Sequence, residues 1–232
     1  MEFVPEHFAN YITRELNGRR AEVLEVGGGA VARMPLPDAH LTVLDSSPDA
    51  LRRNGAARDV LIGDAEDYDY GERRFDLAVF WNVLEHVRRP EAAVERASRS
   101  LKPDGMIVVR GPELYSLKAV VTRYTPHWIH VLYYRRVLGI RDAGTDGRPP
   151  CKVEHQGDAD RQALTSSLRR MGFRIAYELR YVGDQVTELK RFSRLAYLVY
   201  AAASAVARLL TRSRYGTAET EFILVARRPS PA

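Results

Sequence analysis

The chain has 232 residues, 45% of them hydrophobic, which is enough for one globular domain with a substantial core. A single cysteine, Cys151, excludes an internal disulfide, and without a Cys/His cluster at zinc spacing we expect no metal site. Since the start, MEFVPEHFAN, lacks the basic and apolar regions of a signal peptide, we expect a cytoplasmic protein.

The net charge of +5 is concentrated in one segment. Residues 188–214 hold six Lys/Arg and one acidic residue, so the remainder of the chain has no net charge. This distribution argues against a general surface for nucleic acid, because such a surface spreads its positive charge more widely. It marks residues 188–214 as a separate basic, apolar feature.

Short apolar runs alternate with helical stretches, which is the pattern of a mostly parallel sheet covered by helices. The sequence predicts helices at 5–17, 48–54, 90–101 and 160–171. It predicts strands at 21–26, 41–45, 59–63, 75–81, 106–110, 173–182 and 218–227.

Two insertions interrupt this scheme after the fifth and sixth strands, at 112–158 and 185–214. Ligands of open α/β sheets bind beyond the carboxyl ends of the strands. We therefore expect a single domain, 1–232, in which 112–158 covers the substrate and 185–214 forms a basic, apolar helical segment.

The first predicted strand leads into LEVGGGAVARM, residues 24–34, a glycine turn of the kind that lets a backbone approach a nucleotide. Gly27, Gly29 and Ala32 fit the G-x-G-x-x-G/A pattern of a dinucleotide site, and Asp45 follows eighteen residues beyond Gly27. A nicotinamide-dependent oxidoreductase is therefore one alternative.

A dinucleotide site needs a helix after the turn, because the free N–H groups at the helix start hold the pyrophosphate. Pro35 and Pro37 limit a helix that opens at Gly29 to about Met34. S-adenosylmethionine has no phosphate, so the short helix favours this cofactor over a dinucleotide.

Acidic residues follow the next two predicted strands. Asp45 ends the second strand, where a carboxylate can accept both ribose hydroxyls, and Asp64 ends the third, where it can accept the adenine amino group. An aspartate after a strand is also a common turn or helix cap. The order of the two acids after a glycine turn is what favours cofactor binding.

Together, LEVGGGA, VLDSSPDAL, GDAED and FDLAVFWNVLEHV resemble the class I S-adenosylmethionine-dependent methyltransferases, especially the small-molecule "type 11" and ubiquinone/menaquinone group. The resemblance is dense over 21–111 and loose over 160–228. It implies an α/β, doubly wound, Rossmann-like sheet of seven mostly parallel strands with the last one antiparallel. One departure is Val31, which stands where the family has its third glycine.

The resemblance also implies a cofactor site. In it the methionine moiety lies beside Glu25, Gly27, Gly28 and Gly29, the ribose beside Asp45 and Ser46, the adenine beside Asp64 and Ala65, and the sulfonium near Asn82 and Val83.

Histidines are the candidates for a general base, since their pKa suits proton transfer near neutral pH. His86 follows the fourth strand in LEHV; the alternative is a structural residue whose ring bonds the backbone. Its neighbour Glu85 is expected to be solvent-facing or structural.

A second group of candidates lies in TPHWIHVLYYRRVLG, which Thr125 and Gly139 bound as a helix. His127, His130 and Tyr134 share one face of that helix. They could form a base and a polar wall over the pocket, or the histidines could bond neighbouring loops.

The fourth strand is followed by WNVL and not by the Asn/Asp-Pro-Pro-Tyr of many amino-methylating enzymes. This favours methyl transfer to oxygen or carbon of a small-molecule or lipid-linked acceptor. A methyltransferase-like binding or regulatory module that has lost catalysis is the alternative that Val31 suggests.

The basic segment contains thirteen uncharged residues between Arg194 and Arg208. This run is too short to span a bilayer and suits a buried or interfacial helix. Two alternatives stay open: packing on the sheet or a second copy of the chain, and peripheral attachment to a membrane surface through 188–214.

Overall fold

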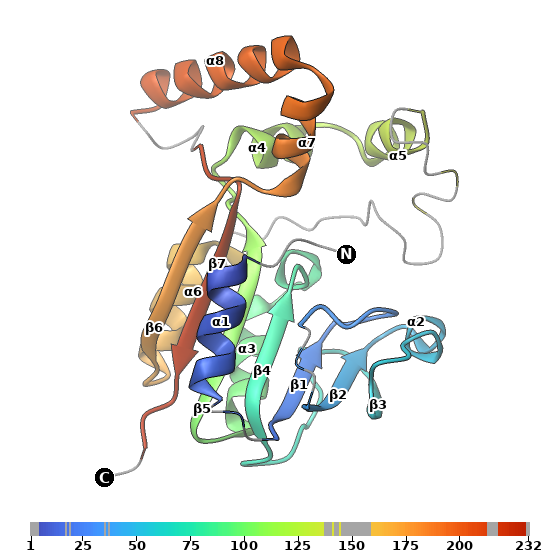
Figure 1. Cartoon of the computed structure of the whole chain (residues 1–232), viewed down its shortest axis with the longest axis vertical. Helices are drawn as coiled ribbons and strands as arrows, with labels where there is room; N and C mark the ends of the chain where they lie inside the picture. Colours follow the sequence, from blue (N-terminus) through green and yellow to red (C-terminus); the bar gives the residue numbers. More distant parts are fainter. Residues whose placement is uncertain are drawn as a thin grey trace.

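Seven strands form a single, mostly parallel sheet in the order β3-β2-β1-β4-β5-β7-β6 (Figure 1). The computed structural model describes residues 5–16, 18, 20–34, 36, 38–136, 141, 144, 159–212 and 218–230. The strands are β1 (Glu22–Val26), β2 (His40–Asp45), β3 (Asp59–Ile62), β4 (Phe75–Trp81), β5 (Leu101–Pro112), β6 (Arg174–Tyr181) and β7 (Glu221–Arg227). Only β7 runs antiparallel to its neighbours, β5 and β6, so the predicted fold class is confirmed.

Helices cover both faces of the sheet, as the alternating pattern predicts. One face packs against α1 (Glu6–Glu15) and α2 (Pro48–Arg52), and the other against α3 (Pro90–Arg99) and α6 (Arg161–Arg170). The short helix η1 (Leu84–His86) follows β4. Successive residues of β4 belong to different cores: Phe80 packs on the α3 side and Val79 on the α1 side. All seven residues of β4 are buried, which makes it the centre of the domain.

The remaining helices form a group at one end of the molecule. After β5 come α4 (Leu117–Tyr124) and α5 (His127–Arg136); after β6 come α7 (Asp184–Phe192) and α8 (Arg194–Leu210). They lie beyond the carboxyl ends of the parallel strands (Figure 1). That the first pair covers a substrate stays a prediction. None of the helices among the described residues is both long and apolar enough to cross a membrane.

Candidate active site

The glycine turn follows β1 and is packed against two neighbouring strands. Gly27 has a φ of +70°, and a Cβ built on it would lie 2.3 Å from Cγ2 of Val83, which follows β4. The Gly27 N–H donates to the carbonyl oxygen of Leu44 in β2 at 2.7 Å. Glycine is therefore needed at position 27 for both conformation and space.

The predicted short helix after this turn does not form. Residues 29–34 are turns and bends. The Glu25 side chain, rather than a helical carbonyl, accepts a backbone N–H of this segment. The Glu25 carboxylate is fully buried and accepts the N–H of Arg33, at 3.0 Å to Oε1 and 3.2 Å to Oε2. Burial raises the pKa of Glu25 to about 7, although the hydrogen bond from Arg33 acts in the opposite direction. Without a helix start among residues 27–34, this turn offers no helical anchor for a pyrophosphate.

Asp45 lies beside the turn at the end of β2. Its Oδ1 accepts the N–H of Ser47 at 2.8 Å, and no hydrogen bond from the described residues reaches its Oδ2. A Cβ built on Gly29, which has a φ of +53°, would lie 3.5 Å from that Oδ2. Asn54 Nδ2 donates to the Gly29 carbonyl at 2.8 Å, which fastens the turn to the residues after α2. The turn and the carboxylate thus face each other; Ser46 beside them is exposed.

Asp64 and Ala65 follow β3, at the same edge of the sheet. Asp64 is exposed and its Oδ1 accepts the N–H of Glu66 at 2.9 Å, while Ala65 is half-buried. Sequence reasoning missed Glu66, a buried residue whose Oε1 accepts the N–H of Arg88 at 2.7 Å and whose Oε2 accepts Nε of Arg89 at 2.8 Å. Glu66 therefore ties the segment after β3 to the segment after β4.

Asn82 and Val83 form the segment directly after β4, and Val83 packs against the glycine turn. Asn82 adopts a φ of +52°, and its N–H donates to the Arg110 carbonyl at 3.0 Å. His86 is exposed, and its N–H donates to the Val83 carbonyl at 2.9 Å. Glu85 is buried, so of its two predicted settings the solvent-facing one is wrong; burial, together with the nearby charge of Glu221, raises its pKa to about 7.

A buried charged cluster at the end of β5 was also missed by sequence reasoning. Arg110 donates from Nε to the Tyr181 hydroxyl at 2.7 Å, and its guanidinium lies 5.2 Å from the ring centre of Trp81. Lys118 Nζ donates to Glu221 Oε1 at 2.6 Å. The only signal in the sequence is that Arg110 directly follows the apolar run MIVV.

The structure does not join the histidines of α5 to the glycine turn by any contact among the described residues. His127 is exposed, and His130 Nε2 lies 2.8 Å from the Thr125 hydroxyl. Helix α5 covers His127–Arg136 of the predicted helix, whose expected end at Gly139 lies outside the described residues. The Thr125 hydroxyl, expected to cap this helix, contacts the His130 ring instead. The Tyr134 side chain and the whole of Cys151 lie outside the described residues. A catalytic role for His127 or His130 stays a prediction.

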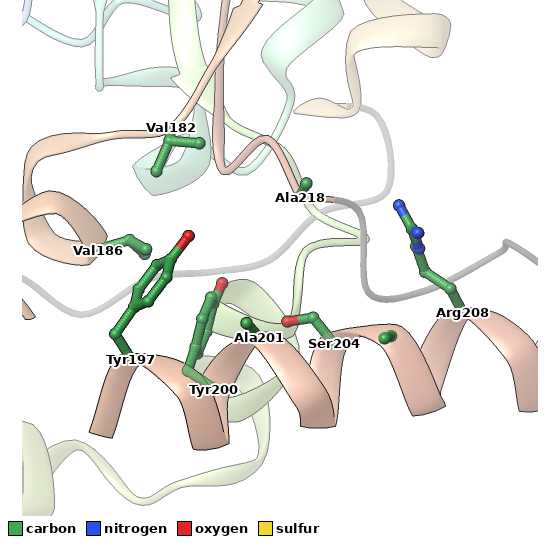
Figure 2. Close-up of a pocket in the computed structure, with 9 residues that line it drawn as sticks. Val182, Val186, Tyr197, Tyr200, Ala201, Ser204, Arg208 and Ala218 are labelled. Carbon is green, nitrogen blue, oxygen red and sulfur yellow. The ribbon is translucent and has the colours of Figure 1, made fainter. Parts of the chain in front are cut away.

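A pocket of about 150 Å³ lies between α8 and the segments that follow β6 (Figure 2). Tyr197, Tyr200 and Ser204 of α8 point into it, opposite Val186, and Arg208 stands toward the other end of the helix. Ser204 is 7% exposed. None of these residues belongs to the predicted cofactor site.

The chain matches a protein family and several curated proteins. A family model described as a methyltransferase domain matches residues 2–177. The chain is 23% identical over 143 residues to a ubiquinone biosynthesis O-methyltransferase of Rickettsia akari, covering 56% of each chain. It is 31% identical over 124 residues to the protein of the same name from Alkalilimnicola ehrlichii, covering 47% of this chain and 49% of the other. The chain thus spans about half the length of the curated relatives it matches.

Solved structures share the fold. A SAM-dependent methyltransferase from Methanosarcina mazei has a TM-score of 0.58 at 14% identity, with both chains fully covered. The N-methyltransferase NodS from Bradyrhizobium japonicum, in complex with S-adenosyl-L-homocysteine, has a TM-score of 0.51 at 14% identity, over 97% of this chain and 87% of the other. The [4+2]-cyclase SpnF has a TM-score of 0.59 at 17% identity, over 97% and 81%.

Proposed function

Because the chain belongs to the methyltransferase domain family, whose methyl donor is S-adenosylmethionine, we propose that it methylates an oxygen or carbon atom of a small-molecule or lipid-linked acceptor. The curated relatives, which are named O-methyltransferases, support oxygen as the acceptor atom. The WNVL sequence at the end of β4, in place of an Asn/Asp-Pro-Pro-Tyr motif, supports the same class.

The observation that carries the proposal is the pairing of Gly29 with Asp45. Glycine suits position 29 because its φ is +53°, and a Cβ built there would come into van der Waals contact with Asp45 Oδ2, so glycine leaves that oxygen accessible from the turn. A carboxylate oxygen that receives no hydrogen bond from the described residues can accept ribose hydroxyls. These residues therefore fit the cofactor, with Gly27 and Gly28 beside its methionine moiety and Asp64 and Ala65 beside its adenine.

The bound cofactor would supply an electrophilic methyl group on a sulfonium. The protein's task is then mainly to hold the acceptor atom in line with that methyl, at about 3 to 3.5 Å. We propose that Glu25 positions the turn through the Arg33 N–H, and that Asn82 and Val83 form the rim of the acceptor site. His86, which follows them, is the proposed base for an acceptor that must lose a proton.

Isothermal titration with S-adenosylhomocysteine tests the cofactor site. Asp45→Ala removes the charged acceptor, and a hydrogen bond to a charged group contributes about 1.5 to 3 kcal/mol, so the variant should bind roughly 10- to 150-fold more weakly. Asp49→Ala is the matched control: Asp49 is exposed in α2 and pairs with Arg52, so this variant should bind like the wild type. Equal binding by wild type and Asp45→Ala, or no heat from the wild type, would refute the site.

A second candidate is a binding module that holds the cofactor without transferring its methyl group. Val31, which is 57% exposed, stands where the family has its third glycine, in a turn that no helix follows. This departure from the family pattern favours the binding module. Incubation with methyl-labelled S-adenosylmethionine and separate lipid and aqueous cell extracts distinguishes the two. Labelled product that depends on the protein excludes the binding module; cofactor binding without product from either extract supports it.

A further inference from the structure

The helix α8 carries apolar side chains on two opposite faces. One face, with Tyr197, Tyr200 and Ser204, points toward the rest of the chain and lines the pocket (Figure 2). The other face has large apolar side chains near both ends of the helix, with the exposed Ala202 and Ala203 between them, and this face forms one stripe about 22 Å long. This outer stripe consists of Leu195, Leu198, Val199, Val206, Leu209 and Leu210.

Each side chain of the outer stripe is between 53% and 81% exposed. Single exposed apolar residues are common on soluble proteins, but a contiguous group along a whole helix marks an interaction site. Helix α8 also lies at the extreme end of the molecule, with α4 and α7 between it and the sheet (Figure 1). No described element covers the outer stripe.

The charges that flank the outer stripe are positive. Arg191 and Arg194 are exposed before it and Arg212 after it, and the sequence has no acidic residue from 189 to 212. Arg208 is also exposed, but it lines the pocket on the opposite face. Helices with an apolar face and flanking Lys/Arg lie in the interface of anionic membranes, where each cation near the surface contributes to binding.

A second helix at the same end of the molecule shows the same combination. Trp128 and Leu132, one turn apart on α5, are 64% and 48% exposed, and Arg136 follows one turn later. Tryptophan is favoured at the boundary between lipid and water. Thus α5 and α8, which lie at the same end of the molecule (Figure 1), each carry exposed apolar and basic side chains.

The positive charge beside the outer stripe favours a membrane over a second copy of the chain as the surface that covers it. Two copies joined through their outer stripes would bring several arginines of one protomer close to those of the other without an acid between them. An anionic lipid surface neutralises the same arginines while it covers the apolar side chains. We propose that the outer stripe of α8, together with α5 at the same end of the molecule, binds peripherally to an anionic membrane surface.

This inference goes beyond the proposed function and does not depend on methyl transfer. The parallel strands end toward the same end of the molecule, so a docked protein would turn its proposed cofactor site toward the lipid (Figure 1). An acceptor with an apolar tail would then reach the site without leaving the membrane.

Vesicle flotation of the full chain tests the proposal. The wild type should float with vesicles of equal parts phosphatidylcholine and phosphatidylglycerol, less with phosphatidylcholine alone, and less at high salt, since surface charges are screened. Leu198→Asp combined with Val206→Asp removes two apolar contacts and should lower binding at least about tenfold. Because both side chains are exposed, the circular dichroism spectrum and melting temperature should not change.

The matched control is Val60→Asp, an exposed apolar residue in β3 at the far edge of the sheet, which should float like the wild type. Light scattering of the protein without lipid tests whether a second copy of the chain covers the outer stripe instead. A dimer that Leu198→Asp with Val206→Asp dissociates, together with no flotation of the wild type, would overturn the proposal in favour of a second copy. Flotation unaffected by the double substitution would also overturn it.

Discussion

Two buried glutamates at the candidate site couple their ionisation to folding in the acidic to neutral pH range. Burial raises the pKa of both Glu25 and Glu85 to about 7, from an ordinary value of 4.5. Between these two pH values the folded state binds protons that the unfolded state has released. The free energy of unfolding must therefore fall as pH rises from about 4.5 to 7, by at most about 3 kcal/mol for each group.

Glu25→Gln should remove part of this pH dependence. The glutamine keeps an oxygen to accept the Arg33 N–H, but it cannot ionise. Urea unfolding at pH 5 and pH 8 should show a smaller loss of stability for the variant than for the wild type, and Glu85 should account for most of the remainder. Glu72→Gln, at an exposed position before β4, is the control and should behave like the wild type. An unchanged pH dependence in Glu25→Gln would refute the assignment of the raised pKa to this residue.

At the scale of elements, the apolar runs predicted all seven strands, although β5 is longer than the predicted strand at 106–110. The helix expected from Gly29 to Met34 does not form. A helix is predicted from residues three and four apart in the sequence. This turn is instead held by Glu25, which accepts the N–H of Arg33, eight residues later. A side chain that satisfies a backbone N–H from a neighbouring element has no periodic signature.

The turn itself should be sensitive to any side chain at its first glycine. Gly27→Ala forces a methyl group into Val83 and a positive φ on an alanine, so it should cost roughly 1 to 3 kcal/mol. For a domain of this size the melting temperature should fall by roughly 2 to 12 °C, with weaker binding of S-adenosylhomocysteine. Calorimetry and titration measure the two effects.

Gly55→Ala is the matched control for this prediction. Gly55 follows α2, and a Cβ built on it would have no neighbour within 4 Å. Its melting temperature should match the wild type or rise slightly, because alanine reduces the freedom of the unfolded chain. If Gly27→Ala melts and binds like Gly55→Ala, the close packing of the turn against Val83 is wrong.

At the scale of the whole molecule, the seven-stranded sheet with its antiparallel last strand followed from the family resemblance, but the buried charges did not. Glu113, for example, accepts hydrogen bonds from Arg161 at 2.8 Å and Arg180 at 3.0 Å, side chains 48 and 67 residues away along the chain. From the sequence alone, charged residues such as these are expected to be exposed to solvent. Such pairs become visible only when the fold brings β5, α6 and β6 together, so sequence patterns predicted the strands themselves better than the charged contacts between them.

The two proposed ligands should protect different parts of the molecule from hydrogen exchange. Amides of β4 and β5 lie in the buried centre and should exchange slowest, while exposed α5 should exchange fastest. S-adenosylhomocysteine should slow exchange at 25–34 and 44–47, and anionic vesicles should slow it at 194–210, each in the absence of the other. Mass spectrometry of peptides measures both. Vesicle protection confined to 25–34, or cofactor protection confined to α8, would show that the glycine turn and the outer stripe have been assigned to the wrong ligands.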